Sequence, residues 1–140
     1  MNIYLSEFSA KRERTADKEY RAAIEAVVSV VNLNNLTLFR SNIHDGYFKI
    51  EKRINLSSLF IALIDNYWES SSWKGFEYTY ASGGLGMSGD ARGNIIPMKM
   101  VYLCEDYEFP KYLKGCPGRT KISRSIPELQ DQLIAAVESQ

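Results

Sequence analysis

The segment Leu59–Ile64, which reads Leu-Phe-Ile-Ala-Leu-Ile, constrains the fold more than any other part of this chain. It is apolar at every position, and the polar residues Asp65 and Asn66 follow it directly. A strand with one face in solvent alternates apolar and polar residues, whereas a strand of a parallel sheet covered on both faces is apolar throughout. The run therefore predicts a central strand of a parallel sheet, with helices on both of its faces.

Strand and helix signals alternate along the rest of the chain. Residues 83–93 are rich in glycine and are expected to form a flexible connection, while residues 105–121 lack periodicity and are expected to be loop with at most a short helix. The remaining strands are expected at 2–5, 36–39 and 94–103, and helices at 15–31, 48–56, 73–81 and 125–138. We therefore predict an α/β, single-domain flavodoxin-like three-layer fold over residues 1–140, with a central parallel sheet of four to five strands.

Composition excludes several classes of protein. Seventeen basic and seventeen acidic side chains balance in 140 residues, so the chain lacks the basic excess of a dedicated nucleic-acid binder. No apolar stretch is long enough to span a bilayer and no export signal is visible, which favours a cytoplasmic protein with no membrane partner. One histidine and two separated cysteines, Cys104 and Cys116, do not make a metal site, and we expect free thiols and no metal.

The segment after the apolar run carries the strongest functional signal. If residues 73–81 form a helix, Trp73 and Glu77 lie four residues apart on one face, close to where a buried strand ends. Ligands of open α/β sheets bind at that edge. An indole could stack a heterocycle and a carboxylate could hold a ribose, although packing explains a tryptophan near a helix start equally well. The pair indicates chemistry on a nucleotide-like substrate.

Glu77 has two plausible roles at a nucleosidic bond. It could attack C1′ and form a covalent glycosyl intermediate, or it could hold the ribose and stabilise an oxocarbenium-like transition state. Both roles need an ionised carboxylate, and partial burial would raise its pKa, so a balancing donor is expected nearby. Arg40, His44 and Lys74 are the candidates, and the sequence does not rank them.

Two loops are candidates for the walls of a pocket. Ser6, Glu7 and Phe8 follow the first predicted strand, where doubly wound folds bind ligands, although turn and capping chemistry explains each residue as well. The second loop follows the strand at 36–39 and runs from Arg40 to Tyr47. Neither loop contains the glycine pattern of a dinucleotide or Walker phosphate loop.

Several motifs together resemble those of a Toll/interleukin-1 receptor (TIR) domain, particularly the stand-alone bacterial kind. The first strand and its loop, 4–9, resemble the first-strand motif of the family, with Glu7 in place of an aromatic residue. Residues 64–67 and 72–77 are similar to the strand-Tyr-Ser-Trp-Cys-x-x-Glu motif, with Lys74 in place of the cysteine. Residues 94–97, Asn-Ile-Ile-Pro, resemble the family's next strand.

The resemblance implies an activity and a site. The glutamate that matches Glu77 cleaves the nicotinamide–ribose bond of NAD in the family members that are enzymes, giving ADP-ribose or cyclic ADP-ribose isomers that signal in anti-phage defence. NAD would then be a substrate, and no cofactor would be needed. The resemblance also implies that the loop containing Arg40, His44, Gly46 and Tyr47 mediates self-association through TIR–TIR contacts and borders the nucleotide pocket. A cyclic product would act on a downstream effector protein.

Two alternatives remain open from the sequence. Many TIR domains are adaptors that only assemble with partners, so the chain could work without catalysis. The nucleoside 2-deoxyribosyltransferases share the flavodoxin-like layout and a glutamate before a helix of small residues, which Phe76–Ala81 also fits. Those enzymes usually begin the first loop with Gly-Pro-Phe, where this chain has Ser6-Glu7-Phe8.

Overall fold

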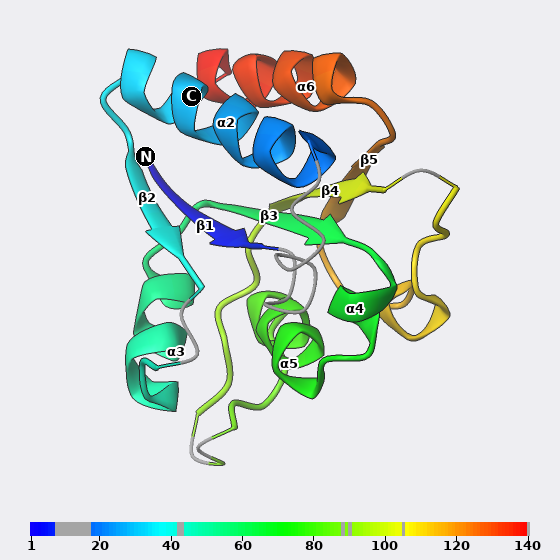
Figure 1. Cartoon of the computed structure of the whole chain (residues 1–140). Coiled ribbons are helices and arrows are strands. Elements are labelled where there is room, and N and C mark those ends of the chain that lie inside the picture. Colours follow the sequence, from blue (N-terminus) through cyan, green and yellow to red (C-terminus); the bar gives the residue numbers. More distant parts are fainter. Residues whose placement is uncertain (8–17, 42–43, 88, 90, 105, 140) are drawn as a thin grey trace.

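Within the residues that the structure describes, five parallel strands form one sheet in the spatial order β2-β1-β3-β4-β5 (Figure 1). The structure is a computed structural model, and it describes residues 1–7, 18–41, 44–87, 89, 91–104 and 106–139. The predicted single-domain flavodoxin-like α/β fold is confirmed. The strands are β1 (Asn2–Ser6), β2 (Thr37–Arg40), β3 (Leu59–Ile64), β4 (Met98–Leu103) and β5 (Arg119–Ser123).

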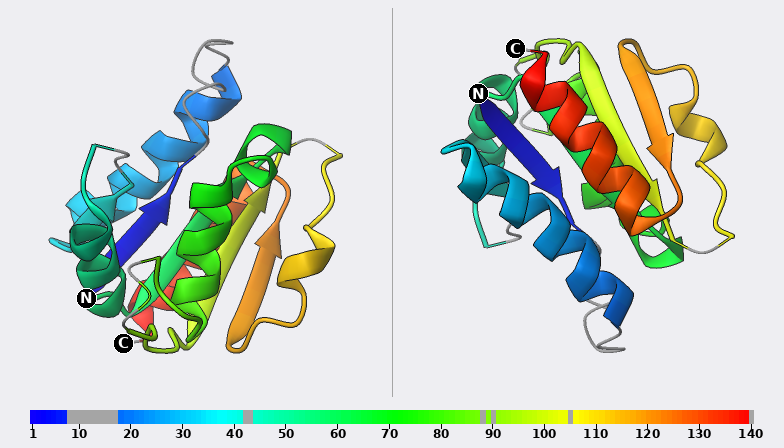
Figure 2. Two further views of the ribbon diagram at one scale, coloured as in Figure 1. Left: turned by 90° about the horizontal axis from the view of Figure 1, so that it is seen from below. Right: turned by 90° about the horizontal axis from the view of Figure 1, so that it is seen from above.

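Helices cover both faces of this sheet and make the predicted three layers. On one face lie α2 (Lys18–Leu33) and α6 (Ile126–Glu138), which pack against each other (Figures 1 and 2). On the other face lie α3 (Tyr47–Asn55), α4 (Asn66–Glu69) and α5 (Ser72–Ala81), and a 3₁₀ turn, η1 (Lys111–Leu113), packs beside α5. None of the described helices is long and apolar enough to cross a membrane.

Alternation along the central strands divides the core in two. Ile3, Leu5 and Ile61 face α2 and α6, whereas Tyr4 and Phe60 face α3 and α5. All six residues of β3 are buried, which is the burial that the apolar run predicts for a strand covered on both sides. Because side chains of a strand alternate between faces, Tyr4 and Ser6 point to the same side of the sheet as α5.

The structure differs from the predicted elements at the end of the sheet. Residues 119–121 were predicted to be loop, and this prediction was wrong because they begin β5. Four of the five β5 residues are exposed at the sheet edge, so this strand has no apolar run to reveal it. β4 begins at Met98, not at residue 94, since Pro97 lacks the N–H that a strand interior needs.

Backbone contacts organise the glycine-rich connection between α5 and β4. Leu85 and Arg92 form an isolated antiparallel bridge, and the Gly93 N–H donates to the Gly84 carbonyl at 2.9 Å. A Cβ on Gly93 would lie 1.9 Å from the carbonyl oxygen of Tyr80. Glycine is therefore required where this connection passes the end of α5.

Candidate active site

The candidate site lies at the carboxyl ends of β1, β2 and β3. The chain passes from β1 outward to β2, and then returns to β3 on the other side of β1, so the strand order reverses between β1 and β3. In open α/β sheets a ligand crevice forms at such a reversal. Ser6 ends β1, Ser41 follows β2 and Asp65 follows β3, which brings three polar residues to this edge.

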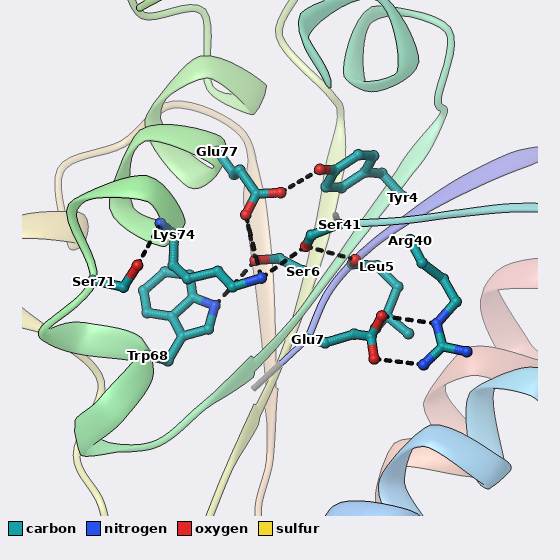
Figure 3. A network of polar contacts seen from close by, with 10 residues as sticks. All are labelled: Tyr4, Leu5, Ser6, Glu7, Arg40, Ser41, Trp68, Ser71, Lys74 and Glu77. Carbon is teal, nitrogen blue, oxygen red and sulfur yellow. Dashed lines mark hydrogen bonds and ion pairs between the residues drawn. The ribbon is translucent and has the colours of Figure 1, made fainter. Parts of the chain in front are cut away.

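Glu77 is the centre of a buried polar network at this edge (Figure 3). Its side chain has no exposed surface. The Tyr4 hydroxyl donates a short hydrogen bond to Oε2, and the Ser6 hydroxyl donates to Oε1 at 3.4 Å. The Lys74 ammonium lies 3.5 Å from the same Oε1. Glu77 is thus held by β1 on one side and by its own helix on the other.

Lys74 is fixed by a second contact as well. Its Nζ donates to the Ser41 hydroxyl at 2.8 Å, and that hydroxyl donates to the carbonyl of Leu5 at 3.3 Å. Ser71 is the N-cap of α5, and its side chain accepts a hydrogen bond from the Lys74 N–H at 3.3 Å. The lysine therefore bridges α5 to the end of β2, and its side chain is only 7% exposed.

Trp68 supports the network from α4. Its indole N–H donates to the Ser6 hydroxyl at 3.0 Å, so that hydroxyl connects Trp68 to Glu77. Asp65 caps α4 by accepting from the Trp68 N–H at 2.8 Å. Trp68 is completely buried, so it packs into the core and also donates this hydrogen bond to Ser6.

Burial governs the ionisation of this network. Removal from water raises the pKa of Glu77 above its usual value, and the nearby Lys74 ammonium and the Tyr4 hydrogen bond oppose that rise. Burial also raises the pKa of Tyr4, and the adjacent Glu77 carboxylate raises it further. Tyr4 therefore remains a hydroxyl donor, and Lys74 is the closest described cation to the Glu77 carboxylate.

Glu7 and Arg40 form a bidentate ion pair beside this network (Figure 3). Arg40 Nε lies 2.7 Å from Glu7 Oε2, and its Nη2 lies 2.5 Å from Oε1. The Glu7 side chain is 11% exposed and that of Arg40 is 49% exposed. The pair joins the loops after β1 and β2, so Arg40 faces Glu7, while Lys74 contacts Glu77.

Trp73 packs against two aromatic rings. Its indole lies 5.1 Å from the Tyr47 ring, centroid to centroid, and 6.2 Å from the Phe76 ring. Its Nε1 atom is buried and has no hydrogen-bond partner among the described residues. Trp73 and Glu77 lie four residues apart on α5, as expected, and the indole makes an aromatic contact between α5 and the start of α3.

Within the second loop, Ser41 joins the Glu77 network through Lys74, whereas the candidate residues His44 and Gly46 lie outside it. Gly46 is the N-cap of α3 and has open space around its Cα, and His44 is exposed. Asp45, just before α3, forms an ion pair with Arg53 in the last turn of that helix. Phe8 lies outside the described residues.

Sequence reasoning named Glu77, Ser6 and Lys74, and it included Ser41 only within the loop 40–47, but it missed Tyr4. The missed tyrosine was detectable, because it lies two residues before Ser6 on a strand and therefore shares its face. Among the described residues, no three His, Cys, Asp or Glu side chains are grouped to hold a metal ion, and neither Cys104 nor Cys116 forms a disulfide.

Comparisons of the chain with family models, with curated proteins and with solved structures give no match. An oriented carboxylate with a hydroxyl donor on one oxygen and a cation on the other can stabilise positive charge or attack an electrophilic carbon.

Proposed function

We propose that this protein is a TIR-like enzyme that cleaves the nicotinamide–ribose bond of NAD, with Glu77 as the catalytic residue. The observation that carries the proposal is the Glu77 carboxylate, which Tyr4, Ser6 and Lys74 hold at the reversal of strand order. Nucleotides bind at such reversals in open α/β sheets. A pre-oriented carboxylate there suits a reaction in which positive charge develops on a ribose.

The proposed reaction is a substitution at C1′ of the nicotinamide ribose. The bond between C1′ and the ring nitrogen breaks, and its electron pair leaves with nicotinamide. The Glu77 carboxylate stabilises the oxocarbenium-like carbon or bonds to it. Water then attacks C1′ and loses a proton, and where Glu77 has bonded to C1′ that bond breaks and its electron pair returns to the carboxylate. The products are nicotinamide and ADP-ribose, or a cyclic isomer when a group of the same nucleotide replaces water.

Access to Glu77 requires a movement, because its side chain has no exposed surface. Tyr4 and Ser6 belong to a central strand, whereas Lys74 lies in the first turn of α5 and has a long flexible side chain. We propose that Lys74 swings away from Ser41 and Glu77 when the nucleotide enters. A phosphate or ribose oxygen of the substrate would then replace the Ser41 hydroxyl as the partner of its ammonium.

Self-association is part of the proposal. Tyr47 and Phe48 are large side chains at the start of α3, and they are 40% and 72% exposed. Exposed apolar residues next to a loop suit a contact between copies of the chain. We propose a cytoplasmic protein whose activity depends on this contact and whose cyclic product, if formed, acts on an effector protein.

The test is incubation of the protein with NAD at low and high protein concentration, with nicotinamide and nucleotide products identified by mass. Glu77→Gln should abolish nicotinamide release, whereas Glu69→Gln, at an exposed residue of α4, should not change it. A parallel assay with deoxynucleosides and a free base detects deoxyribosyl transfer. Turnover of NAD that survives Glu77→Gln would remove this residue from the mechanism, and absence of turnover at every concentration would favour an adaptor.

A further inference from the structure

A groove lies between the outer edge of β5 and the segment 108–114, away from Glu77. It encloses about 560 Å³, and Phe109, Leu113 and Ile122 supply its apolar lining. Lys114 and Arg124 also line it. The volume falls in the range of about 300–1,000 Å³ that is usual for ligand pockets, and one apolar side chain with its backbone would fit such a space.

The outer wall of this groove is fixed to the core. The Phe109 ring lies 6.0 Å from that of Tyr78, and Leu113 is 1% exposed. The Tyr112 hydroxyl lies 3.0 Å from the position that a Cβ would take on Gly75 of α5, so η1 rests closely on that helix. Because both walls are packed, the groove is preformed.

The inner wall is a strand with one free edge. The Arg119 N–H donates to the Pro97 carbonyl at 2.9 Å, toward β4. Successive N–H groups of a strand point in opposite directions, so those of Thr120 and Ile122 point away from β4. The Ile122 carbonyl points outward too, since it accepts from the Gln132 side chain at 3.2 Å. Neither outward N–H has a backbone partner among the described residues.

The segment of the chain that forms most of the groove is basic in a neutral protein. Residues 109–127 contain five Lys or Arg and no Asp or Glu, so the rest of the chain has an excess of five acidic side chains. All five bases are exposed: Lys111, Lys114, Arg119, Lys121 and Arg124. Glu108 is the one acid among the lining residues. A field of this sign attracts an acidic partner.

We propose that the edge of β5 is a docking site for an extended acidic segment of a partner protein, which adds to the sheet as a sixth strand. The outward N–H groups of Thr120 and Ile122 would supply the backbone hydrogen bonds. Ile122, Phe109 and Leu113 would take one apolar side chain, and Lys114 and Arg124 would pair with acidic residues on either side of it.

Two other occupants fit the surface less well. A second copy of the chain that paired through its own β5 would bring two sets of five positive charges together, which is unfavourable. A nucleic acid would gain from the basic residues, but it would not use an apolar slot or outward strand N–H groups, and Glu108 would repel its phosphates.

The proposal is tested by selecting from a displayed library of random heptapeptides on the immobilised wild-type chain. We expect enriched peptides in which acidic residues alternate with an apolar one, and binding that weakens at least tenfold between low salt and 0.5 M salt. The matched backbone variants are Thr120→Pro and Thr120→Val, since proline removes the outward N–H and valine keeps it. Thr120→Pro should reduce affinity at least tenfold, and Thr120→Val should not.

Two readouts on the enriched peptide complete the test. The double variant Lys114→Glu, Arg124→Glu should also lose at least tenfold in affinity, while far-UV circular dichroism shows that each variant is folded. Hydrogen exchange at the Thr120 and Ile122 amides should slow when the peptide binds. A selection without acidic enrichment, equal binding by Thr120→Pro and Thr120→Val, stronger binding of a single-stranded oligonucleotide, or unchanged exchange at both amides would each overturn the proposal.

Discussion

The Tyr4 hydroxyl donates a short hydrogen bond to the Glu77 carboxylate inside the protein, although the two residues are 73 positions apart in the sequence. The bond joins the central strand β1 to helix α5, and both side chains are fully buried. Burial raises the pKa of both groups, so the proton stays on the tyrosine while the carboxylate accepts from it. This hydrogen bond therefore couples the ionisation of Glu77 to the packing of β1 against α5.

Replacing Tyr4 with phenylalanine removes that donor without changing the shape of the ring. The buried Glu77 carboxylate then lacks one partner, and we expect the free energy of unfolding to fall by about 1–3 kcal/mol. Urea denaturation at pH 7 measures the change. Phe60→Leu, at the stacked neighbouring ring, is a control for loss of packing, and it should not alter the pH dependence of stability.

Glu77→Gln should change how stability depends on pH. Burial raises the pKa of Glu77 in the folded state above its value in the unfolded chain, which is about 4.3. At a pH between these two pKa values, the folded state binds more protons than the unfolded state does. The stabilisation is complete below the unfolded pKa and is lost as pH rises through the folded pKa. Denaturation at several pH values should show this slope in the wild type and not in Glu77→Gln; equal slopes would contradict the assignment.

Lys74→Met should extend to higher pH the range over which protonation of Glu77 stabilises the folded state. The Lys74 ammonium is the nearest opposing charge, so its removal raises the pKa of Glu77 further. Where the carboxylate is ionised, it is left without a cation, and breaking a buried pair in this way costs about 3–5 kcal/mol. Lys74→Arg keeps the charge and is the control. Carboxyl titration by NMR measures the pKa of Glu77 directly in both variants.

The Glu7–Arg40 pair should contribute little by comparison. The Arg40 side chain is 49% exposed, and solvent screens such a pair, so a double-mutant cycle with Glu7→Gln and Arg40→Gln should give about 0.5–1 kcal/mol. Salt at 0.5 M should reduce this coupling. A coupling above about 2 kcal/mol that did not respond to salt would contradict the solvent-screened geometry.

Gly93→Ala should destabilise the protein by about 1–3 kcal/mol or more, because the added Cβ would lie 1.9 Å from the Tyr80 carbonyl oxygen. The backbone there cannot yield without disturbing the end of α5. Gly115→Ala is the matched control, since a Cβ on Gly115 meets nothing within 4 Å. Thermal unfolding of the two variants compares them, and equal midpoints would contradict the close approach.

The sequence predicts those parts of the fold that carry a local pattern, such as an apolar run or a helix-capping residue. Leu59–Ile64 is apolar throughout and lies at the sheet centre, so its position was predictable. Ser125 before Pro127 and Glu128 predicts the start of α6, and its side chain does accept from the Glu128 N–H. β5 was not predicted, because four of its five residues are exposed at the sheet edge and its sequence therefore has no apolar pattern that would indicate a strand.

The site was predictable only as far as local spacing reaches. Glu77 and Lys74 lie one helical turn apart, so their contact is a local one. The Tyr4 and Ser41 contacts depend on how distant strands pair, which a single sequence does not specify. The contact between Trp73 and Tyr47 at the start of α3 likewise depends on tertiary packing, which the spacing of Trp73 and Glu77 does not specify.

Two neighbouring residues of α5, Glu77 and Tyr78, contact different strands of the sheet. Glu77 is held by β1, while the Tyr78 hydroxyl lies 3.2 Å from that of Thr120 on β5 and its ring contacts Phe109. One turn of α5 therefore carries the buried carboxylate and also contacts two residues that line the β5 groove, Thr120 and Phe109. By thermodynamic linkage, if a bound strand shifts this turn and changes nucleotide affinity by some factor, the nucleotide changes the affinity for that strand by the same factor.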